Sequence, residues 1–157
     1  MTTLWTIGYA GANPEGLIAT LRAVGIELLV DVRAVPASRR PGFSKGTLAA
    51  ALGEAGIGYR HLKGLGTPAA GREAARAGRL EQFERIFREH LEVLEAQADL
   101  ATLESLLGAG KRLCLLCLEA DPARCHRAIV AEELRRRLSL EVRHLVPEPE
   151  PATVLRD

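Results

Sequence analysis

The chain of 157 residues has few aromatic residues, few cysteines and no long apolar run. Only 4% of its residues are aromatic, which leaves few rings on which the bases of a single-stranded nucleic acid could stack. No apolar stretch reaches the roughly 18 residues that a membrane-spanning helix needs, and the start of the chain lacks the charged and apolar regions of a signal peptide. No glycine pattern of a dinucleotide site or P-loop occurs, so the sequence requires no organic cofactor.

The cysteine content and the length indicate one reduced, globular domain. Three cysteines are an odd number in a chain large enough to fold without disulfides, so we expect free thiols and a cytoplasmic location. With 47% hydrophobic and 26% charged residues, the chain is typical of a single domain with its own core. We predict that this domain covers residues 1–146 and that a proline-bearing tail follows over residues 147–157.

The formal net charge of +1 conceals a segregation of charge along the chain. Residues 33–45 contain four basic residues and no acidic one, and residues 60–79 contain five basic residues against the single acid Glu73. Residues 80–104 contain seven acidic residues against two arginines. The small net charge argues against a polybasic protein, but the segregation predicts two positive loops and one acidic, solvated surface.

The spacing of apolar residues predicts strands that alternate with helices. Asn13 is a good N-cap and Pro14 a good first position for a helix that Gly25 ends, and apolar strand-like runs flank this helix. A strand, a helix and a second strand in this order form a parallel unit. We therefore predict an α/β fold, a single three-layer domain with a mostly parallel sheet of about five strands and helices on both faces. The predicted strands are 3–8, 26–33, 57–62, 111–118 and 141–145, the predicted helices are 14–24, 44–52, 80–94, 99–107 and 122–138, and residues 63–79 stay unassigned.

Polar side chains follow the predicted strands at the edge where a parallel sheet binds its ligands. Such ligands bind outside the carboxyl ends of the strands, because loops and helix N-termini meet there. We expect this edge to collect candidate residues from several segments of the chain. They are Tyr9, Asp31, Arg33, Arg39, Arg40, Lys45, His61, Cys117 and Glu119.

The segment from Cys117 to Arg127 carries most of the groups that could do chemistry. Cys114 lies three residues before Cys117 on one predicted strand, so the two side chains point to opposite faces and Cys114 is expected in the core. His126 and Arg127 belong to the first turns of the next helix, whose free amides and guanidinium would form an anion site and lower the pKa of a nearby thiol. Cys125 joins that site only if the helix begins later than predicted.

Five motifs occur in order along the chain: residues 6–11 (TIGYAG), 29–33 (LVDVR), 38–45 (SRRPGFSK), 59–62 (YRHL), and Cys117 with Glu119 followed by 125–127 (CHR). Through them the sequence resembles the family catalogued as domain of unknown function 488, from Thr6 to about Leu145. The resemblance implies a small bacterial or archaeal cytosolic α/β protein without an established activity. Its motifs include the residues expected at the sheet edge, so it supports the position of the site and not a reaction.

These residues favour an enzyme that acts on an anionic, phosphate-bearing substrate such as a nucleotide or nucleic acid, in a hydrolase-like or transferase-like reaction. Cys117 is the candidate nucleophile or polarised thiol, and Glu119 and His126 are the candidate general acid and base. The candidate substrate-binding residues are Tyr9, Asp31, Arg33, Arg39, Arg40, Lys45, His61 and Arg127.

Three alternatives stay open on the sequence. The two positive loops could bind nucleic acid or another anionic partner without catalysing a reaction. The residues could also be structural: His126 could cap strand carbonyls, Arg127 could pair with a carboxylate, and Cys117 could pack in the core. The third alternative is a metal site, although the spacing would be unusual for structural zinc. Its ligands would be Cys117, Glu119, Cys125 and His126.

Overall fold

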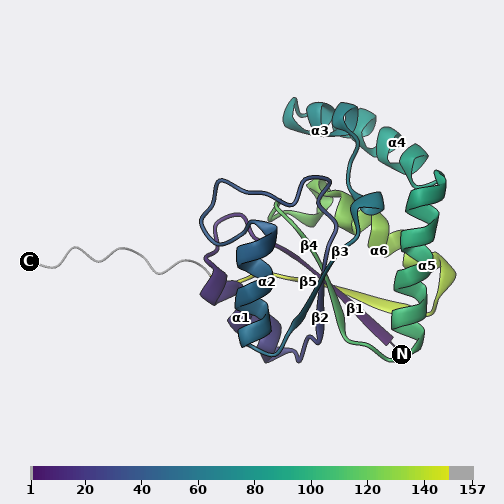
Figure 1. The fold of residues 1–157 in the computed structure, drawn as a ribbon. Helices are drawn as coiled ribbons and strands as arrows, with labels where there is room; N and C mark the ends of the chain where they lie inside the picture. Colours follow the sequence, from purple (N-terminus) through teal and green to yellow (C-terminus); the bar gives the residue numbers. More distant parts are fainter. Residues whose placement is uncertain (1, 149–157) are drawn as a thin grey trace, which may run out of the picture.

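The computed structural model describes residues 2–148 and shows an α/β domain built on one parallel sheet (Figure 1). Within this range the sheet has five strands in the order β3-β2-β4-β1-β5, and every neighbouring pair is parallel. The predicted fold class is confirmed. The strands are β1 (Thr2–Gly8), β2 (Leu28–Asp31), β3 (Gly58–His61), β4 (Leu113–Cys117) and β5 (Leu140–Leu145).

Helices cover both faces of the sheet, as the sequence predicts. Figure 1 shows α1 and α2 on one side of the sheet and α5 and α6 on the other, while α3 and α4 stand above one end of it. The helices are α1 (Pro14–Ala23), α2 (Lys45–Glu54), α3 (Ala69–Arg76), α4 (Leu80–His90), α5 (Leu94–Gly108) and α6 (His126–Arg137), and two short 3-10 turns are η1 (Lys63–Leu65) and η2 (Pro122–Arg124).

The sheet separates two hydrophobic cores. Every residue of β4 is buried, as expected for a central strand that is covered on both faces. Cys114 belongs to the core under α1 and α2, whereas Cys117 belongs to the core under α4, α5 and α6. The prediction that these two cysteines lie on opposite faces is confirmed, and Cys114 is completely buried.

Local signals placed some elements correctly and missed others. Asn13 caps α1 by accepting a hydrogen bond from the Gly16 amide, 2.8 Å away, and Pro14 is the first helical residue. The unassigned segment 63–79 forms η1 and α3. The buried residues of α3 are Gly71 and Ala74. Because glycine and alanine give a weak apolar signal, the spacing did not reveal this helix. The prediction of one continuous helix from Pro122 was wrong, because residues 122–124 form the separate turn η2 and α6 begins at His126.

The strand order puts a switch point between β1 and β4. The chain leaves β1 through α1 toward β2, on one side of the sheet, and leaves β4 through α6 toward β5, on the other. Gly8 and Cys117 are paired at the ends of these two strands, and the Tyr9 amide donates to the Cys117 carbonyl at 3.1 Å. A parallel sheet opens a ligand crevice where neighbouring connections diverge in this way.

The predicted tail begins against α1. Pro147 is buried, and the Glu148 amide donates to Thr20 Oγ1 on α1 at 3.0 Å. The remainder of that predicted tail, residues 149–157, lies outside the described residues. Within residues 2–148, no helix has both the length and the apolar composition that crossing a membrane requires.

Candidate functional site

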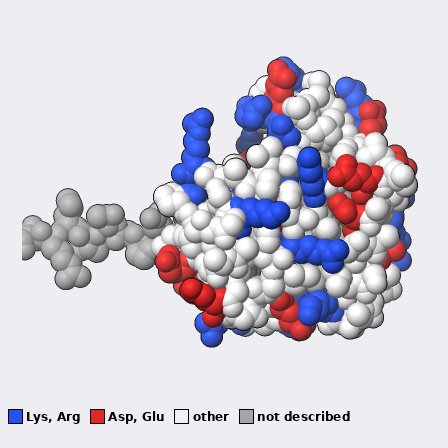
Figure 2. Space-filling view, in the orientation of Figure 1, with Lys and Arg blue, Asp and Glu red and all other residues white. Residues whose placement is uncertain are grey.

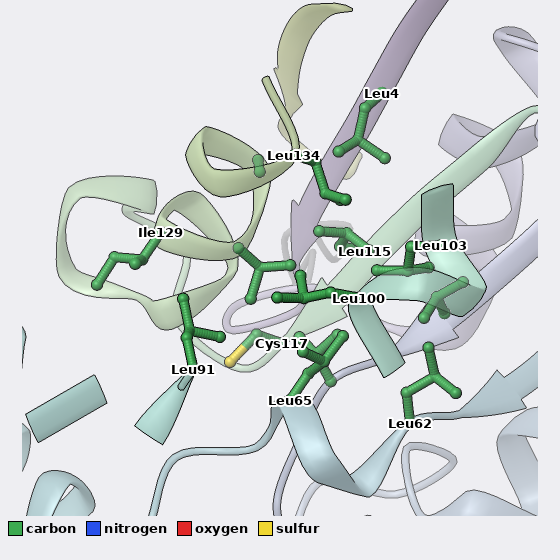
Figure 3. Close-up of a cluster of buried hydrophobic side chains, with 14 of the residues drawn as sticks. Leu4, Leu62, Leu65, Leu91, Leu100, Leu103, Leu115, Cys117, Ile129 and Leu134 are labelled. Carbon is green, nitrogen blue, oxygen red and sulfur yellow. The ribbon is translucent and has the colours of Figure 1, made fainter. Parts of the chain in front are cut away.

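Two thiols and an imidazole meet between the end of β4 and the start of α6. Cys117 ends β4, Cys125 is the N-cap of α6, and His126 is the first residue of that helix. His126 Nδ1 lies 3.6 Å from Cys117 Sγ and 3.8 Å from Cys125 Sγ, and all three side chains are buried. Figure 3 shows the Cys117 sulfur beside Leu65 and Leu91 within a cluster of buried side chains. Cys125 therefore joins the site, because the helix begins later than its sequence suggests.

The imidazole of His126 is held in one orientation. Its Nε2 lies 2.6 Å from the carbonyl oxygen of Val32, which can only accept a hydrogen bond. Nε2 therefore carries the proton, and in the neutral ring Nδ1 presents a lone pair to the two sulfurs. The ring also packs edge-on against Phe87, with centroids 5.1 Å apart. The sequence had offered a bond between His126 and a strand carbonyl as a structural role, and here that bond turns the other nitrogen toward the thiols.

The pKa values of the two thiols in the cluster are shifted in opposite directions. Burial opposes a thiolate at Cys125, but a hydrogen bond from the Cys117 thiol and the charges of His126 and Arg127 lower the pKa of Cys125 well below its usual value. The hydrogen bond to Cys125 and burial raise the pKa of Cys117. Burial also opposes protonation of His126, but the charge on Cys125 and the bond to Val32 raise its pKa. The cluster thus concentrates negative charge on Cys125, at the N-terminus of α6.

Arg127 fixes the loop between β4 and α6. It is completely buried, and its guanidinium donates to Thr6 Oγ1 at 3.1 Å and to the carbonyl oxygens of Glu119 and Ala120. The loop also passes close over β1, because a Cβ added at Gly8 would lie 1.8 Å from the Glu119 carbonyl oxygen. Arg127 therefore positions the loop. Its N–H groups, which the sequence analysis assigned to a substrate, donate to backbone carbonyl oxygens of this loop instead.

A buried ion pair lies at the end of β2. Arg33 Nη2 lies 2.7 Å from an Asp31 carboxylate oxygen, and Arg33 Nη1 donates to Tyr9 Oη at 3.1 Å and to the Phe43 carbonyl at 2.7 Å. Tyr59 donates its hydroxyl to Asp31. Burial and this hydrogen bond to a carboxylate raise the pKa of Tyr59. Asp31 is thus a buried support for Arg33, which in turn donates to the Tyr9 hydroxyl.

A cavity of about 270 Å³ opens beside the cluster and is lined by four arginines. Arg33 comes from the end of β2, Arg72 and Arg76 from α3, and Arg124 from η2. Arg72 donates to the Thr67 carbonyl at 2.9 Å, which holds it along the wall. On the face drawn in Figure 2, Lys and Arg side chains cross the middle of the domain and, mixed with acidic ones, surround its upper end. The remaining wall residues that matter here are Tyr9, Val35, Phe83, Cys117, Glu119, Cys125 and His126.

The structure brings part of the predicted site together. Tyr9, Arg33, Cys117, Glu119 and His126 line the cavity. The other predicted residues do not line the cavity. Asp31 and Arg127 are buried supports, and His61 Nε2 lies 2.7 Å from the Arg33 carbonyl oxygen. Arg40 donates to the Ala12 carbonyl, whereas Arg39, on the loop before α2, and Lys45, in the first turn of α2, are exposed.

Three arginines that line the cavity were not among the site residues predicted from the sequence. Arg72 and Arg76 belong to the basic segment 60–79, whose charge was visible although its structure was not. Arg124 follows Pro122 by two residues and was assigned to the helix instead of to a turn. The excess of basic residues in 60–79 was the only sequence signal for α3 as a wall of the site.

Comparison with known proteins agrees with the resemblance seen in the sequence. The family model described as Domain of unknown function DUF488 matches residues 13–134. The chain belongs to this family. The match includes Cys117, Cys125, His126 and all four arginines of the cavity, and it begins after the motif at residues 6–11. No curated protein and no solved structure matches the chain.

Proposed function

We propose that this protein is an enzyme that binds an anionic, phosphate-bearing substrate in the arginine-lined cavity and hydrolyses or transfers a group at the cluster of Cys117, Cys125 and His126. One observation carries the proposal: four arginines and the thiol-imidazole cluster line the same cavity at the switch point of the sheet. Positive charge alone would indicate binding, and a reactive cluster alone would indicate chemistry. Their presence in one cavity supports both.

The arginines of the cavity support a phosphate-bearing substrate. A guanidinium matches the oxygens of a phosphate with two parallel hydrogen bonds, and three of the four arginines, Arg72, Arg76 and Arg124, stand apart from the Asp31–Arg33 ion pair, so the cavity favours an anionic ligand. The cavity also has an apolar wall that includes Val35 and Phe83. A nucleotide, or the end of a nucleic-acid strand, offers both a phosphate for the arginines and a flat apolar base for this wall.

The cluster and Glu119 support hydrolysis or group transfer as the class of reaction. The Cys125 thiol lies at the N-terminus of α6, where the helix dipole favours negative charge, and His126 Nδ1 faces it. The Glu119 side chain is exposed on the cavity wall, where a carboxyl group can donate or accept a proton. These groups suit hydrolysis or group transfer at a phosphorus or carbonyl centre, with Arg33 near the developing charge.

A cytoplasmic location is part of the proposal. All three cysteines are free and buried in the structure, and free thiols are typical of proteins in a reducing compartment. Fractionation of cells that express the chain at its natural level would test this location.

The first test measures binding by the shift in melting temperature with phosphate, mononucleotides, and single-stranded and duplex oligonucleotides. A ligand that binds only the folded protein raises its melting temperature. We expect a shift with phosphate-bearing ligands that Arg72→Ala and Arg124→Ala reduce. Arg88→Ala is the matched control, because Arg88 is an exposed arginine of α4 that pairs with Glu84 away from the cavity. A chain that shows no shift with any anion would overturn the proposal.

The second test separates an enzyme from a binding protein. Phosphate monoesters, phosphate diesters and acyl phosphates are offered to the wild type and to Cys125→Ser, and released product is measured. We expect turnover that the variant loses while it keeps the shift with phosphate. Binding that survives in both proteins without turnover of any ester would leave a non-catalytic anion-binding module in place of the enzyme.

A further inference from the structure

We propose that Cys117 Sγ, Cys125 Sγ and His126 Nδ1 form a zinc site whose fourth position opens to the arginine-lined cavity. The binding of the metal rests on the geometry of the cluster alone. The use of the fourth position by a substrate rests on the proposed function. The two parts are therefore tested separately.

The distances within the cluster suit one tetrahedral ion. With zinc bonded to sulfur at about 2.3 Å and to nitrogen at about 2.0 to 2.1 Å, a tetrahedral angle separates the sulfur and nitrogen ligands by about 3.6 Å. The Nδ1 atom of His126 lies 3.6 Å from one sulfur and 3.8 Å from the other. All three ligand atoms lie within 4.8 Å of one another. An ion placed between them requires only small movements of the side chains.

The hydrogen bonding around His126 also fits a metal ligand. A histidine that binds a metal commonly donates its second ring N–H to a carbonyl or carboxylate, which fixes the ring and its tautomer. His126 has this arrangement, because its Nε2 donates to the Val32 carbonyl at 2.6 Å and leaves Nδ1 directed at the sulfurs. Phe87 packs against the ring and hinders its rotation.

The protein holds the ligands in place before any ion arrives. Cys117 is fixed at the end of β4, and Cys125 and His126 are fixed as the N-cap and first residue of α6. Arg127 ties the intervening loop down through the carbonyl oxygens of Glu119 and Ala120. The ligands come from rigid elements and a clamped loop, so binding an ion involves little ordering of the chain.

Charge balance favours a cation here. Two thiolates side by side in a buried site repel each other, so without a cation only one can be ionised. A divalent ion neutralises both thiolates, and with the neutral imidazole the loaded cluster has no net charge. Sulfur and imidazole ligands select zinc over magnesium or calcium, which prefer oxygen.

Three protein ligands leave one position for water or substrate, and this is the arrangement of catalytic zinc sites. All three ligands line the arginine cavity, so the fourth position faces the space where the phosphate group would bind. Glu119 lines the same cavity but is outside the group of three ligands, in contrast to the four-ligand site that the sequence offered. A zinc ion there would polarise a bound oxygen of the substrate.

Metal content and cobalt spectra of the full chain test the site. The protein is produced with added zinc, purified without chelator, and its zinc is measured by mass spectrometry; cobalt is then exchanged for zinc and the absorption spectrum recorded. We expect about one equivalent of zinc per chain and a spectrum with tetrahedral cobalt bands and a sulfur-to-cobalt charge-transfer band. Negligible zinc together with the lack of a charge-transfer band would overturn the inference.

Variants identify the ligands. Cys117→Ser, Cys125→Ser and His126→Gln should each lower the affinity for the metal by roughly 10-fold or more, because even changes to residues that only support metal ligands have an effect of this size. Cys114→Ala is the matched control, because Cys114 is a buried thiol of the same strand on the opposite face of the sheet. Equal metal content in the control and in all three variants would contradict the assignment. If a ligand variant fails to fold, the sulfur band of the cobalt-loaded wild type and its loss on chelation decide the question.

The results distinguish this site from the proposed function. Arg72→Ala should reduce the shift with phosphate and keep its zinc, because Arg72 lies on the cavity wall and outside the cluster. A chain with zinc but without anion binding would keep the metal site and remove the proposed function. A chain with anion binding but without zinc or cobalt binding would remove the metal site alone.

Discussion

Asp31 and Arg33 form a buried ion pair in which both Nε and Nη2 of the guanidinium lie within 3.1 Å of the carboxylate. Asp31 is completely buried and Arg33 is 6% exposed. Only Val32 separates the two residues at the end of β2, so a short stretch of backbone places both charges. Arg33 reaches the cavity only because Asp31, Tyr9 and the Phe43 carbonyl hold its side chain in that direction.

Replacing Asp31 with asparagine should cost stability and move Arg33. The change leaves a buried guanidinium without its counter-charge, which costs on the order of 3 kcal/mol in the free energy of unfolding. Urea denaturation measures this loss. The matched control is Glu84→Gln, which breaks an exposed pair with Arg88 and should cost less than about 1 kcal/mol. Similar losses in the two variants would contradict the buried role of Asp31.

Arg127→Lys should destabilise the protein and expose the thiols. A lysine cannot reach Thr6, Glu119 and Ala120 together, so partly buried carbonyl oxygens lose their donor, at a cost of about 2 kcal/mol or more. The freed loop should let a thiol reagent attack Cys117 and Cys125 faster than in the wild type. Denaturation and the rate of thiol labelling measure the two effects.

Arg124→Lys serves as the control for Arg127, because Arg124 is exposed in η2 and keeps its charge in the variant. It should leave stability and the labelling rate nearly unchanged. An Arg127→Lys protein with normal stability but weakened phosphate binding would show instead that Arg127 holds the ligand.

Gly8→Ala should disrupt the site, whereas Gly46→Ala should be tolerated. The new methyl group at position 8 would lie 1.8 Å from the Glu119 carbonyl oxygen, so β1 or the loop must move. A methyl group at position 46 meets no atom within 4 Å, and alanine in helix α2 should add up to about 1 kcal/mol of stability. Melting temperatures of both variants check this, and an unaffected Gly8→Ala protein would contradict the close approach.

Glu119→Gln should lower turnover without lowering stability. The carboxylate is exposed on the cavity wall, and only the backbone carbonyl of Glu119 binds Arg127, so the fold does not depend on the charge. Loss of a general acid or base reduces turnover by roughly 100-fold or more. Rates and melting temperatures are compared with Glu132→Gln, an exposed glutamate of α6. A large drop in melting temperature for Glu119→Gln would mark this residue as structural.

The fold was predictable because its signals are local. The apolar run of β4, the cap of α1 by Asn13 and the alternation of strands and helices follow from neighbouring residues. Helix α3 gave no comparable signal, since its buried residues are glycine and alanine. The start of α6 was also misplaced: Asp121 and Pro122 are good helix-starting residues, but Asp121 caps only the 3-10 turn η2 by accepting from the Ala123 amide at 2.9 Å.

The sequence by itself determined the α/β class and predicted that Cys117, Glu119 and His126 lie together at the carboxyl edge of the sheet, where they line one cavity. Only the tertiary structure decided which arginines meet them. Arg33 is held by its ion pair with Asp31, and Arg127 donates to backbone carbonyl oxygens. Helix α3 supplies Arg72 and Arg76 from a segment whose apolar residues show no clear helical spacing. The reason is physical: helix and strand periods depend on near neighbours, whereas the partner of a charged side chain depends on which distant segment the packed chain brings beside it.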